Sequence, residues 1–315
     1  MSEAPRTEAV GAAIACAGLT KDYGQGRGLF DLDLEIHRGE IFGFIGPNGA
    51  GKSTTIRLLM DLIRPTRGSA TLLGLDAHRD SLAVKRRVGY LPGELPQYPG
   101  VTAGHVIGLL AGLRGGVDPE RIRLLADRFD LDLGRKFSEL SHGNKQKVGL
   151  VQAFMHQPEL LILDEPTLGL DPLMQREFRG LLEESVAAGA TVLLSSHVLA
   201  EVELVCHRIG LIRAGRLLRV GSMAELRRIS GHRIEAIVRG HRDVTELAAL
   251  PGITDAQARG GRVSCTVHGP VGPLLEWLTT GEVIELDSRE LSLEEVFLYE
   301  LEPATSTTAK PGPPG

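Results

Sequence analysis

The spacing at which apolar residues recur changes along this chain, and each spacing predicts a type of secondary-structure element. Residues 30–36 alternate strictly between apolar and polar side chains, which is typical of a half-exposed strand. Residues 40–45, 160–163 and 191–195 form largely apolar runs, which are typical of strands buried on both faces of a parallel sheet. Residues 55–63 instead carry apolar side chains at helical spacing. This succession predicts an α/β fold built on a largely parallel sheet.

Shorter runs predict further elements around this sheet. Residues 13–19 are expected to form an edge strand, and residues 69–74 and 87–91 two more strands. A loop rich in proline and glycine follows at 92–100, and leucines at helical spacing then make 103–137 a helical region inserted between strands. The same patterns predict helices at 174–188 and 201–205, and strands at 208–212 and 216–220.

The pattern changes past Gly231, where alternating and helical runs are short and interleaved. This mixture predicts a small α+β unit, in which no catalytic constellation is recognisable. The tail at 304–315 is rich in threonine, proline and glycine, a composition that predicts disorder. Strands of the small unit are expected at 233–239, 262–267 and 282–286, and helices at 243–250, 272–280 and 292–301.

Composition narrows the class of protein. The chain has 315 residues, enough for a large domain with a small companion, and its formal net charge of −5 provides no basic field for nucleic acid. No apolar run approaches the roughly 20 residues of a membrane span, and residues 1–11 contain no apolar signal segment. The three cysteines lack metal-ligand spacing. We therefore expect a soluble cytosolic protein without a direct nucleic-acid partner.

A glycine-rich loop with the spacing G-x-x-x-x-G-K-[ST] lies between the strand at 40–45 and the helix at 55–63. Its glycines let successive N–H groups point at an anion, and the helix N-terminus adds partial positive charge. A glycine turn that merely starts a helix is the alternative, but strand, loop and helix together favour phosphate binding. Lys52 is expected to reach the β- and γ-phosphates of a nucleoside triphosphate, and the Ser53 hydroxyl to ligate Mg²⁺. The predicted binding residues of this loop are Gly46, Pro47, Asn48, Gly49, Ala50, Gly51, Lys52, Ser53 and Thr54.

The buried run at 160–163 ends in two acids, Asp164 and Glu165. Adjacent carboxylates are costly in a dry core, but they suit the C-terminal edge of a parallel sheet, where ligands of open α/β folds bind. There Asp164 is expected to hold Mg²⁺, and Glu165 to orient and deprotonate an attacking water. His197 follows the next buried strand and is expected at the same edge, although a lone histidine is more often structural.

Three further positions are ambiguous on pattern alone. Ser141 has the position of an N-cap, which makes it an ordinary helix start. Tyr23 lies on a turn between two strands upstream of the phosphate loop, where a plain surface tyrosine explains it equally well. Residues 169–171 are expected to turn into the helix at 174–188.

In order and spacing these motifs resemble those of the nucleotide-binding subunits of ABC transporters, specifically the single-domain ATPases of the drug-exporter (ABC-2 type) branch. The resemblance covers about residues 13–228. Its most specific motif is the signature loop, usually Leu-Ser-Gly-Gly-Gln in the family and Leu-Ser-His-Gly-Asn at 140–144 here. The guanine-reading motif Asn-Lys-x-Asp of GTPases does not occur in the sequence. The resemblance therefore implies ATP as the nucleotide.

The family's fold gives an expected division of the chain. A flexible N-terminus at 1–12 is followed by an ABC ATPase domain of the P-loop NTPase fold at 13–230. This domain is expected to contain an antiparallel β subdomain and a helical subdomain at about 92–158. A small C-terminal α+β domain at 231–303 and the disordered tail at 304–315 complete the chain.

The resemblance also implies roles for individual residues. Tyr23 matches the aromatic residue that stacks on adenine, and His197 the histidine that contacts the γ-phosphate. Asp171 matches the aspartate that links two active sites. Ser141 and Gly143 match signature residues that act on the ATP of the opposite subunit. Because the sequence has one phosphate loop, two copies, or one copy and a similar ATPase subunit, are expected to meet head to tail.

The implied function is binding and hydrolysis of ATP, with Mg²⁺, to power an integral membrane export permease encoded on a separate chain. The protein is then expected in the cytoplasm, peripheral to the inner face of the cell membrane. Permease contact is expected at the loop 92–104 and the helical insert.

Two departures from the family pattern leave alternatives. His142 and Asn144 replace the usual glycine and glutamine of the signature. Gly93 and Glu94 stand at or beside the place where the family normally has a loop glutamine that touches Mg²⁺ and water. A glycine has no side chain to ligate a metal, so Glu94 or water would have to substitute. A soluble ABC ATPase without a transport role and a nucleotide-binding switch with weak hydrolysis are the alternative functions.

Overall fold

The computed structural model describes residues 11–225, 231–240 and 243–291. The chain forms two compact units, which divide between Gly221 and Ser222. The expected boundary after residue 230, the helix at 292–301 and the tail at 304–315 lie outside the described residues, as does most of the segment 1–12.

The first unit contains a central sheet of six strands in the order β10-β9-β3-β8-β7-β6. From β9 to β6 all neighbours are parallel, and every residue of β3, β7 and β8 is buried. The parallel sheet expected from the continuous apolar runs is thereby confirmed, because strands covered on both faces cannot alternate. The strands are β3 (Ile41–Ile45), β6 (Val88–Leu91), β7 (Leu160–Asp164), β8 (Thr191–Ser196), β9 (Arg208–Arg213) and β10 (Arg216–Ser222).

A second sheet of the first unit is antiparallel and has the order β2-β1-β4-β5. The outer strand β2 shows the expected alternation of buried and exposed residues. The prediction that residues 13–19 form an edge strand is wrong, since β1 pairs with β2 on one side and with β4 on the other. Its second partner follows the phosphate loop and a helix in the chain, so no local pattern indicates the pairing. The strands are β1 (Ala12–Asp22), β2 (Gly28–His37), β4 (Arg67–Leu72) and β5 (Leu75–Asp76).

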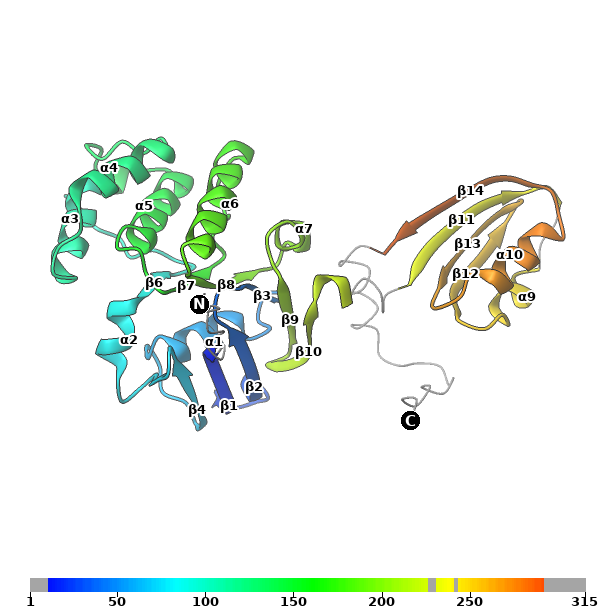
Figure 1. The fold of residues 1–315 in the computed structure, drawn as a ribbon, viewed down its shortest axis with the longest axis horizontal. Coiled ribbons are helices and arrows are strands. Elements are labelled where there is room, and N and C mark those ends of the chain that lie inside the picture. Colours follow the sequence, from blue (N-terminus) through cyan, green and yellow to red (C-terminus); the bar gives the residue numbers. More distant parts are fainter. Residues whose placement is uncertain (1–10, 226–230, 241–242, 292–315) are drawn as a thin grey trace, which may run out of the picture. The chain divides into compact units, whose positions relative to one another are not determined.

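Helix α1 contacts strands of both sheets, whereas α3, α4 and α5 gather at one end of the unit (Figure 1). The insert expected between β6 and β7 is thus helical. The sequence did not predict α2, which buries one residue, Val84, and therefore has little apolar periodicity. The helices are α1 (Lys52–Leu59), α2 (Ser81–Arg87), α3 (Ala103–Leu113), α4 (Pro119–Arg128), the 3₁₀ turn η1 (Phe137–Glu139), α5 (His142–Phe154), α6 (Pro172–Ala187) and α7 (Leu199–Glu203).

The second unit has the chain order βαββαβ and an antiparallel sheet in the order β14-β11-β13-β12, which is the ferredoxin-like arrangement. Its core packs Leu247, Leu274, Trp277 and Leu278 of the helices against the sheet. The sequence did not predict β12, whose residues are only partly buried or exposed. The elements are β11 (His232–Val238), α9 (Val244–Ala248), β12 (Ile253–Arg259), β13 (Arg262–Val267), α10 (Gly272–Thr279) and β14 (Val283–Glu290).

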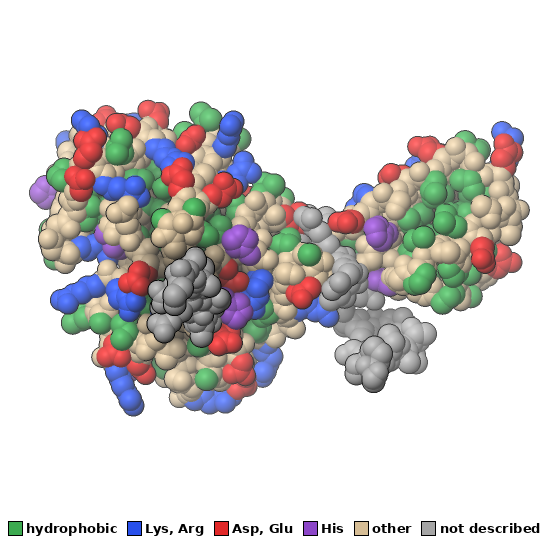
Figure 2. Space-filling model, viewed as in Figure 1, with side chains coloured by type: hydrophobic (Ala, Val, Ile, Leu, Met, Phe, Trp, Pro, Cys, Tyr) green, Lys and Arg blue, Asp and Glu red, His purple; other side chains and the backbone are tan. Residues whose placement is uncertain are grey.

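The surface of the first unit carries both signs of charge. Figure 2 shows lysine and arginine side chains interspersed with aspartate and glutamate on the face that it displays. This mixture agrees with the small net charge of −5. In the part of the chain that the structure describes, we find no helix with the length and apolar character needed to cross a bilayer.

Candidate nucleotide-binding site

The phosphate loop joins the end of β3 to the start of α1, as the sequence predicts. Gly49 and Gly51 have φ values of +80° and +113°, a conformation that favours glycine. The bond that opens the helix runs from the Thr55 N–H to the Gly51 carbonyl over 2.9 Å, and no side chain caps the helix at Gly51. Backbone N–H groups of the first turn are therefore available to an anion. These groups belong to Lys52, Ser53 and Thr54.

A cavity of about 510 Å³ opens over this loop. Every predicted loop residue except Gly46 lines it. A Cβ atom on Gly46 would lie 2.3 Å from the Ile212 carbonyl oxygen, so this glycine is required for close packing behind the loop. Tyr23 also lines the cavity, and it is 49% exposed. The rest of the wall is formed by Gly26, Arg27, Gly28, Glu165 and Ala214.

Sequence reasoning missed Arg27 and Ala214 as cavity residues. Ala214 lies in the turn between β9 and β10, and the next residue, Gly215, donates its N–H to the Ala50 carbonyl over 2.8 Å. This contact between distant segments exists only in the tertiary structure. The sequence could have indicated Arg27, because it is a basic residue on the same turn as Tyr23. In the structure the Tyr23 N–H donates to the Arg27 carbonyl over 2.9 Å.

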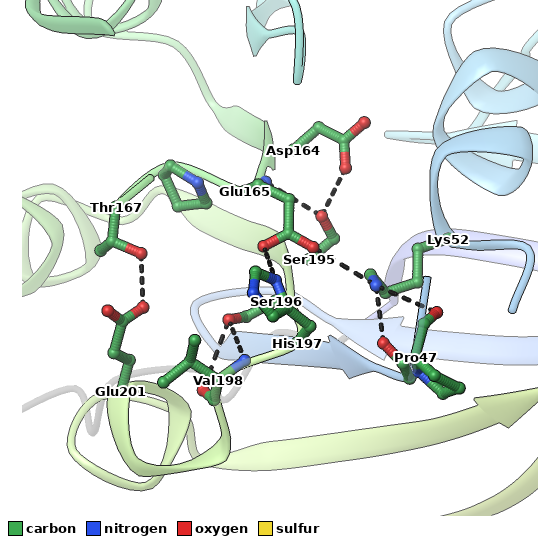
Figure 3. A network of polar contacts seen from close by, with 12 residues as sticks. Pro47, Lys52, Asp164, Glu165, Thr167, Ser195, Ser196, His197, Val198 and Glu201 are labelled. Atoms are coloured by element: carbon green, nitrogen blue, oxygen red, sulfur yellow. Dashed lines mark hydrogen bonds and ion pairs between the residues drawn. The ribbon is translucent and has the colours of Figure 1, made fainter. Parts of the chain in front are cut away.

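Glu165 lies between a lysine and a histidine (Figure 3). Its Oε1 is 3.3 Å from Lys52 Nζ, and its Oε2 is 2.8 Å from His197 Nδ1. Lys52 is only 5% exposed and also donates to the Gly46 carbonyl over 2.6 Å, which compensates the burial of its charge. The structure thus brings together three predicted site residues from the phosphate loop, the end of β7 and the end of β8.

Asp164 is buried behind this group. Its Oδ1 accepts a hydrogen bond of 2.5 Å from Ser195 Oγ on the neighbouring strand β8. A Cβ atom on Gly93 would lie 3.1 Å from its Oδ2, so this glycine faces the carboxylate, whereas Glu94 is exposed. Burial and then the charge of Asp164 raise the pKa of Tyr90 to about 12, which keeps that phenol protonated. Asp164 is not among the residues that line the cavity.

The signature loop lies apart from the cavity of its own chain. Ser141 caps α5 and Asp171 caps α6, and each side chain accepts a backbone N–H of its own helix. A Cβ atom on Gly143 would lie 2.3 Å from the Gly169 carbonyl oxygen, so the start of α5 packs against the turn before α6. Ser141, Gly143 and Asp171 do not line the cavity. One copy of the chain therefore brings these three residues together but not to the phosphate loop.

The loop, the cavity and the strand-end acids define a class of protein. Both the phosphate loop and Glu165 lie at the C-terminal edge of a parallel sheet, which is the ligand edge of open α/β folds. The chain is therefore an α/β nucleotide-binding protein of the P-loop class.

Comparison with known proteins identifies the family. The sequence pattern of the ABC transporter family matches residues 29–168. The chain is also 34% identical over 301 residues to the daunorubicin resistance ATP-binding protein DrrA3 of Streptomyces coeruleorubidus, a match that covers 91% of this chain and 95% of that protein. The chain therefore belongs to the ABC transporter family and is one of its ATP-binding proteins.

A solved structure described as the ATP binding subunit of an ABC transporter has the same fold, with a TM-score of 0.63 and 33% identity. The match covers 69% of this chain and 92% of that one, and it confirms the expected ABC ATPase fold. The probable multidrug ABC transporter ATP-binding protein YbhF of Escherichia coli (strain K12) is 36% identical over 219 residues, which are 68% of this chain. That match spans 38% of the length of YbhF.

Proposed function

We propose that this chain binds ATP with Mg²⁺ between two copies of itself, or one copy and a similar subunit, and hydrolyses it to drive a separate export permease. The observation that carries the proposal is that Lys52 and Glu165 line one cavity, with Nζ 3.3 Å from Oε1. A cation for phosphate and a carboxylate for water are the two groups that this hydrolysis requires. Support for transport comes from the match to the ABC transporter family, and DrrA3 is named as a daunorubicin resistance ATP-binding protein.

The cavity suits the shape of a nucleoside triphosphate. The phosphate chain would lie on the loop, where the N–H groups at the start of α1 and the ammonium of Lys52 meet negative charge. Tyr23 offers an aromatic ring to the flat face of adenine. Because Tyr23 and the loop line the same cavity, one ligand can contact both.

The side chains of Ser53 and Asp164 fit Mg²⁺, which prefers hard oxygen ligands. In the described part of the chain, no group of three or more His, Cys, Asp and Glu side chains could hold a metal ion. Mg²⁺ usually takes one or two protein oxygens and completes its shell with phosphate and water. When bound, Mg²⁺ would neutralise charge on the phosphates. Ser53 and Asp164 are the residues that would hold it.

Glu165 is the proposed general base. Its carboxylate lines the cavity, where it can orient and deprotonate a water molecule beside the terminal phosphate. The contact of 2.8 Å between Oε2 and His197 Nδ1 holds one carboxylate oxygen in place. His197 would contact the γ-phosphate, since its side chain is 42% exposed beside Glu165.

A second copy would complete the site through the signature loop. Ser141 and Gly143 lie at the N-terminus of α5, where backbone N–H groups favour an anion, and they do not line the cavity of their own chain. We assign them to the ATP of the partner, with Asp171 at the adjoining start of α6 linking the two sites. ATP then favours the closed dimer, and hydrolysis restores the open dimer. This change in the populations of the two states could drive a conformational change of the permease.

We place permease contact on the loop 92–104 and helix α3. Leu109 and Leu113 of α3 are 55% and 77% exposed, and since they lie four residues apart on one helix they share a face that a partner could cover. This contact would hold the protein at the inner face of the cell membrane. The loop 92–104 also carries Gly93, next to Asp164, so movement of the permease would reach the nucleotide site.

A nucleotide-binding switch with weak hydrolysis is the second candidate. It is favoured by one observation, that a glycine, Gly93, faces the Asp164 carboxylate. By resemblance, Gly93 stands at or beside the place of the family's loop glutamine. A turnover number for the purified protein far below the roughly 1–10³ s⁻¹ of typical enzymes would favour the switch.

The variant Glu165→Gln tests the proposed function. It removes the base but keeps the shape of the side chain, so ATP should bind as in the parent, turnover should be lost, and a dimer should accumulate with ATP. ATP hydrolysis, nucleotide affinity and mass by light scattering measure the three effects. Hydrolysis at the parent's rate would contradict the assignment of Glu165. Co-purification with an integral membrane protein separates a transport subunit from a soluble ABC ATPase.

A further inference from the structure

Glu165 has a backbone conformation that is rare for its residue type. Its φ is +51°, in the left-handed region that glycine occupies without strain and that other residues avoid. Such a conformation persists only where the surrounding structure holds it. The residue that carries the proposed base is therefore under strain, and the groups that hold its two peptide units decide where its carboxylate points.

Two side chains hold these peptide units, one on each side. The Glu165 N–H donates to Ser195 Oγ over 3.0 Å. The Glu165 carbonyl accepts from Gln146 Nε2 over 3.1 Å, and the same nitrogen donates to the Pro166 carbonyl, also over 3.1 Å. An amide NH₂ group has two hydrogens, so Gln146 matches two successive carbonyl groups. Gln146 is only 3% exposed, and these bonds therefore form away from water.

Gln146 reaches Glu165 from the helix that begins at the signature loop. It lies in the second turn of α5, which Ser141 caps. The first turn of the same helix packs against Gly169 through Gly143. Helix α5 thus contacts the segment after β7 at two points, once at Glu165 and Pro166 and again at Gly169.

We propose that Gln146 is a positioning residue, which holds Glu165 in its left-handed conformation and so directs the carboxylate toward Lys52 and His197. This inference rests on the proposed function, because it takes Glu165 as the base. Its consequence concerns the dimer. In the dimer, Ser141 would touch the partner's ATP while Gln146 of the same helix holds the base of its own site. Helix α5 would then transmit occupancy of one site to the geometry of the other.

The test compares two glutamines of one helix. Gln146→Met keeps the approximate shape of the side chain and removes both donors. Gln152→Met is the matched control, because Gln152 lies on α5 as well and donates to a backbone carbonyl, that of Tyr90, over 2.8 Å. Both variants lose an amide hydrogen bond from α5, and only one of them releases Glu165.

We expect Gln146→Met to lower kcat about 10–100-fold, the cost of a misplaced catalytic group. The Kd for ATP and the melting temperature should stay close to those of Gln152→Met, which should hydrolyse ATP like the parent. Gln146→Glu is isosteric and places an acceptor against the two carbonyl groups, so its kcat should fall at least as far.

Two results would overturn the inference. These are a parent-like kcat in Gln146→Met and an equal loss in Gln152→Met. If Gln146→Met does not fold, Gln146→Asn decides the question, since it keeps the amide but is one methylene too short to reach the carbonyl groups. Parent-like hydrolysis by Glu165→Gln alone would instead overturn the proposed function and leave the bonds of Gln146 without a catalytic role.

Discussion

The Nδ1 atom of His197 lies 2.8 Å from Oε2 of Glu165, and this contact joins the ends of two neighbouring parallel strands. The other carboxylate oxygen, Oε1, lies 3.3 Å from Lys52 Nζ. A carboxylate held at both oxygens has a fixed direction, which is the condition for general-base catalysis at a defined water position. Substitutions of these three residues are therefore expected to be non-additive.

The variant His197→Ala should lower kcat about 100-fold, because the carboxylate of Glu165 loses one of its two fixed contacts. ATP affinity should change less than tenfold, because Lys52 and the N–H groups at the start of α1 would still hold the phosphates. Steady-state hydrolysis and equilibrium binding of a fluorescent ATP analogue measure the two effects. His78→Ala is the control, as that side chain is 55% exposed beside Asp61 and away from the nucleotide loop. A tenfold or greater loss of ATP affinity would place His197 in binding instead.

The variant Lys52→Ala should lose ATP affinity by at least about tenfold, which corresponds to the roughly 1.5–3 kcal/mol of hydrogen bonds to charged groups. Lys52 is the buried cation of the cavity wall, and without it the phosphates lose the ammonium group that lies at the phosphate loop. Isothermal titration with ATP measures the change. Lys136→Ala, which removes a lysine that is 62% exposed, should bind ATP like the parent. Unchanged affinity in Lys52→Ala would count against the phosphate loop as the nucleotide site.

The variant Gly93→Ala should raise the concentration of Mg²⁺ that hydrolysis requires. Its Cβ atom would lie 3.1 Å from Asp164 Oδ2, which is closer than ordinary contact, so the carboxylate must shift by a few tenths of an ångström. We expect the Mg²⁺ concentration for half-maximal activity to rise about 3–10-fold, since Mg²⁺ demands near-ideal octahedral geometry. Gly108→Ala in α3 meets no atom within 4 Å and is the control. If the rate of hydrolysis depended on the Mg²⁺ concentration as it does in the parent, the assignment of Asp164 as a Mg²⁺-binding residue would be wrong.

The stability of the first unit should fall in acid through His156. Burial and then the positive charge of Arg114 lower the pKa of this histidine to about 4, while its Nε2 lies 3.3 Å from the Val88 carbonyl oxygen. An unfolded histidine has a pKa of about 6.5, so between these values the unfolded chain binds the proton and the folded chain does not. The contribution of neutral His156 to the free energy of unfolding is complete above pH 6.5 and is lost progressively as the pH falls toward 4.

Because His156 is partly exposed, we expect this loss to be on the order of 1–2 kcal/mol. Urea unfolding at pH 7 and pH 5 measures it. The variant His156→Gln keeps a donor for the Val88 carbonyl but does not titrate, so the difference between the two pH values should shrink. An equal difference in parent and variant would show that other groups produce the acid sensitivity.

Much of the architecture could be predicted because local patterns of apolar and polar residues indicate most of its helices and strands. The run at 160–163 is continuously apolar, and β7 is buried along its whole length. Ser141 precedes a helical run, and it caps α5 as predicted. The failures concern elements with weak apolar patterns, such as α2, which buries one residue, and β12, which is only partly buried or exposed.

The sequence by itself determined the phosphate loop and the acids at the end of β7, since each is a short run of neighbouring residues whose types and spacing indicate a nucleotide site. The order of these motifs along the chain also determined the family of this protein. Only the tertiary structure decided that β1 lies inside its sheet, that Ala214 borders the cavity, and that Gln146 holds the peptide of Glu165. These contacts join residues far apart in the chain, and the energy of a buried hydrogen bond or a strand pair depends on a partner that no local pattern names.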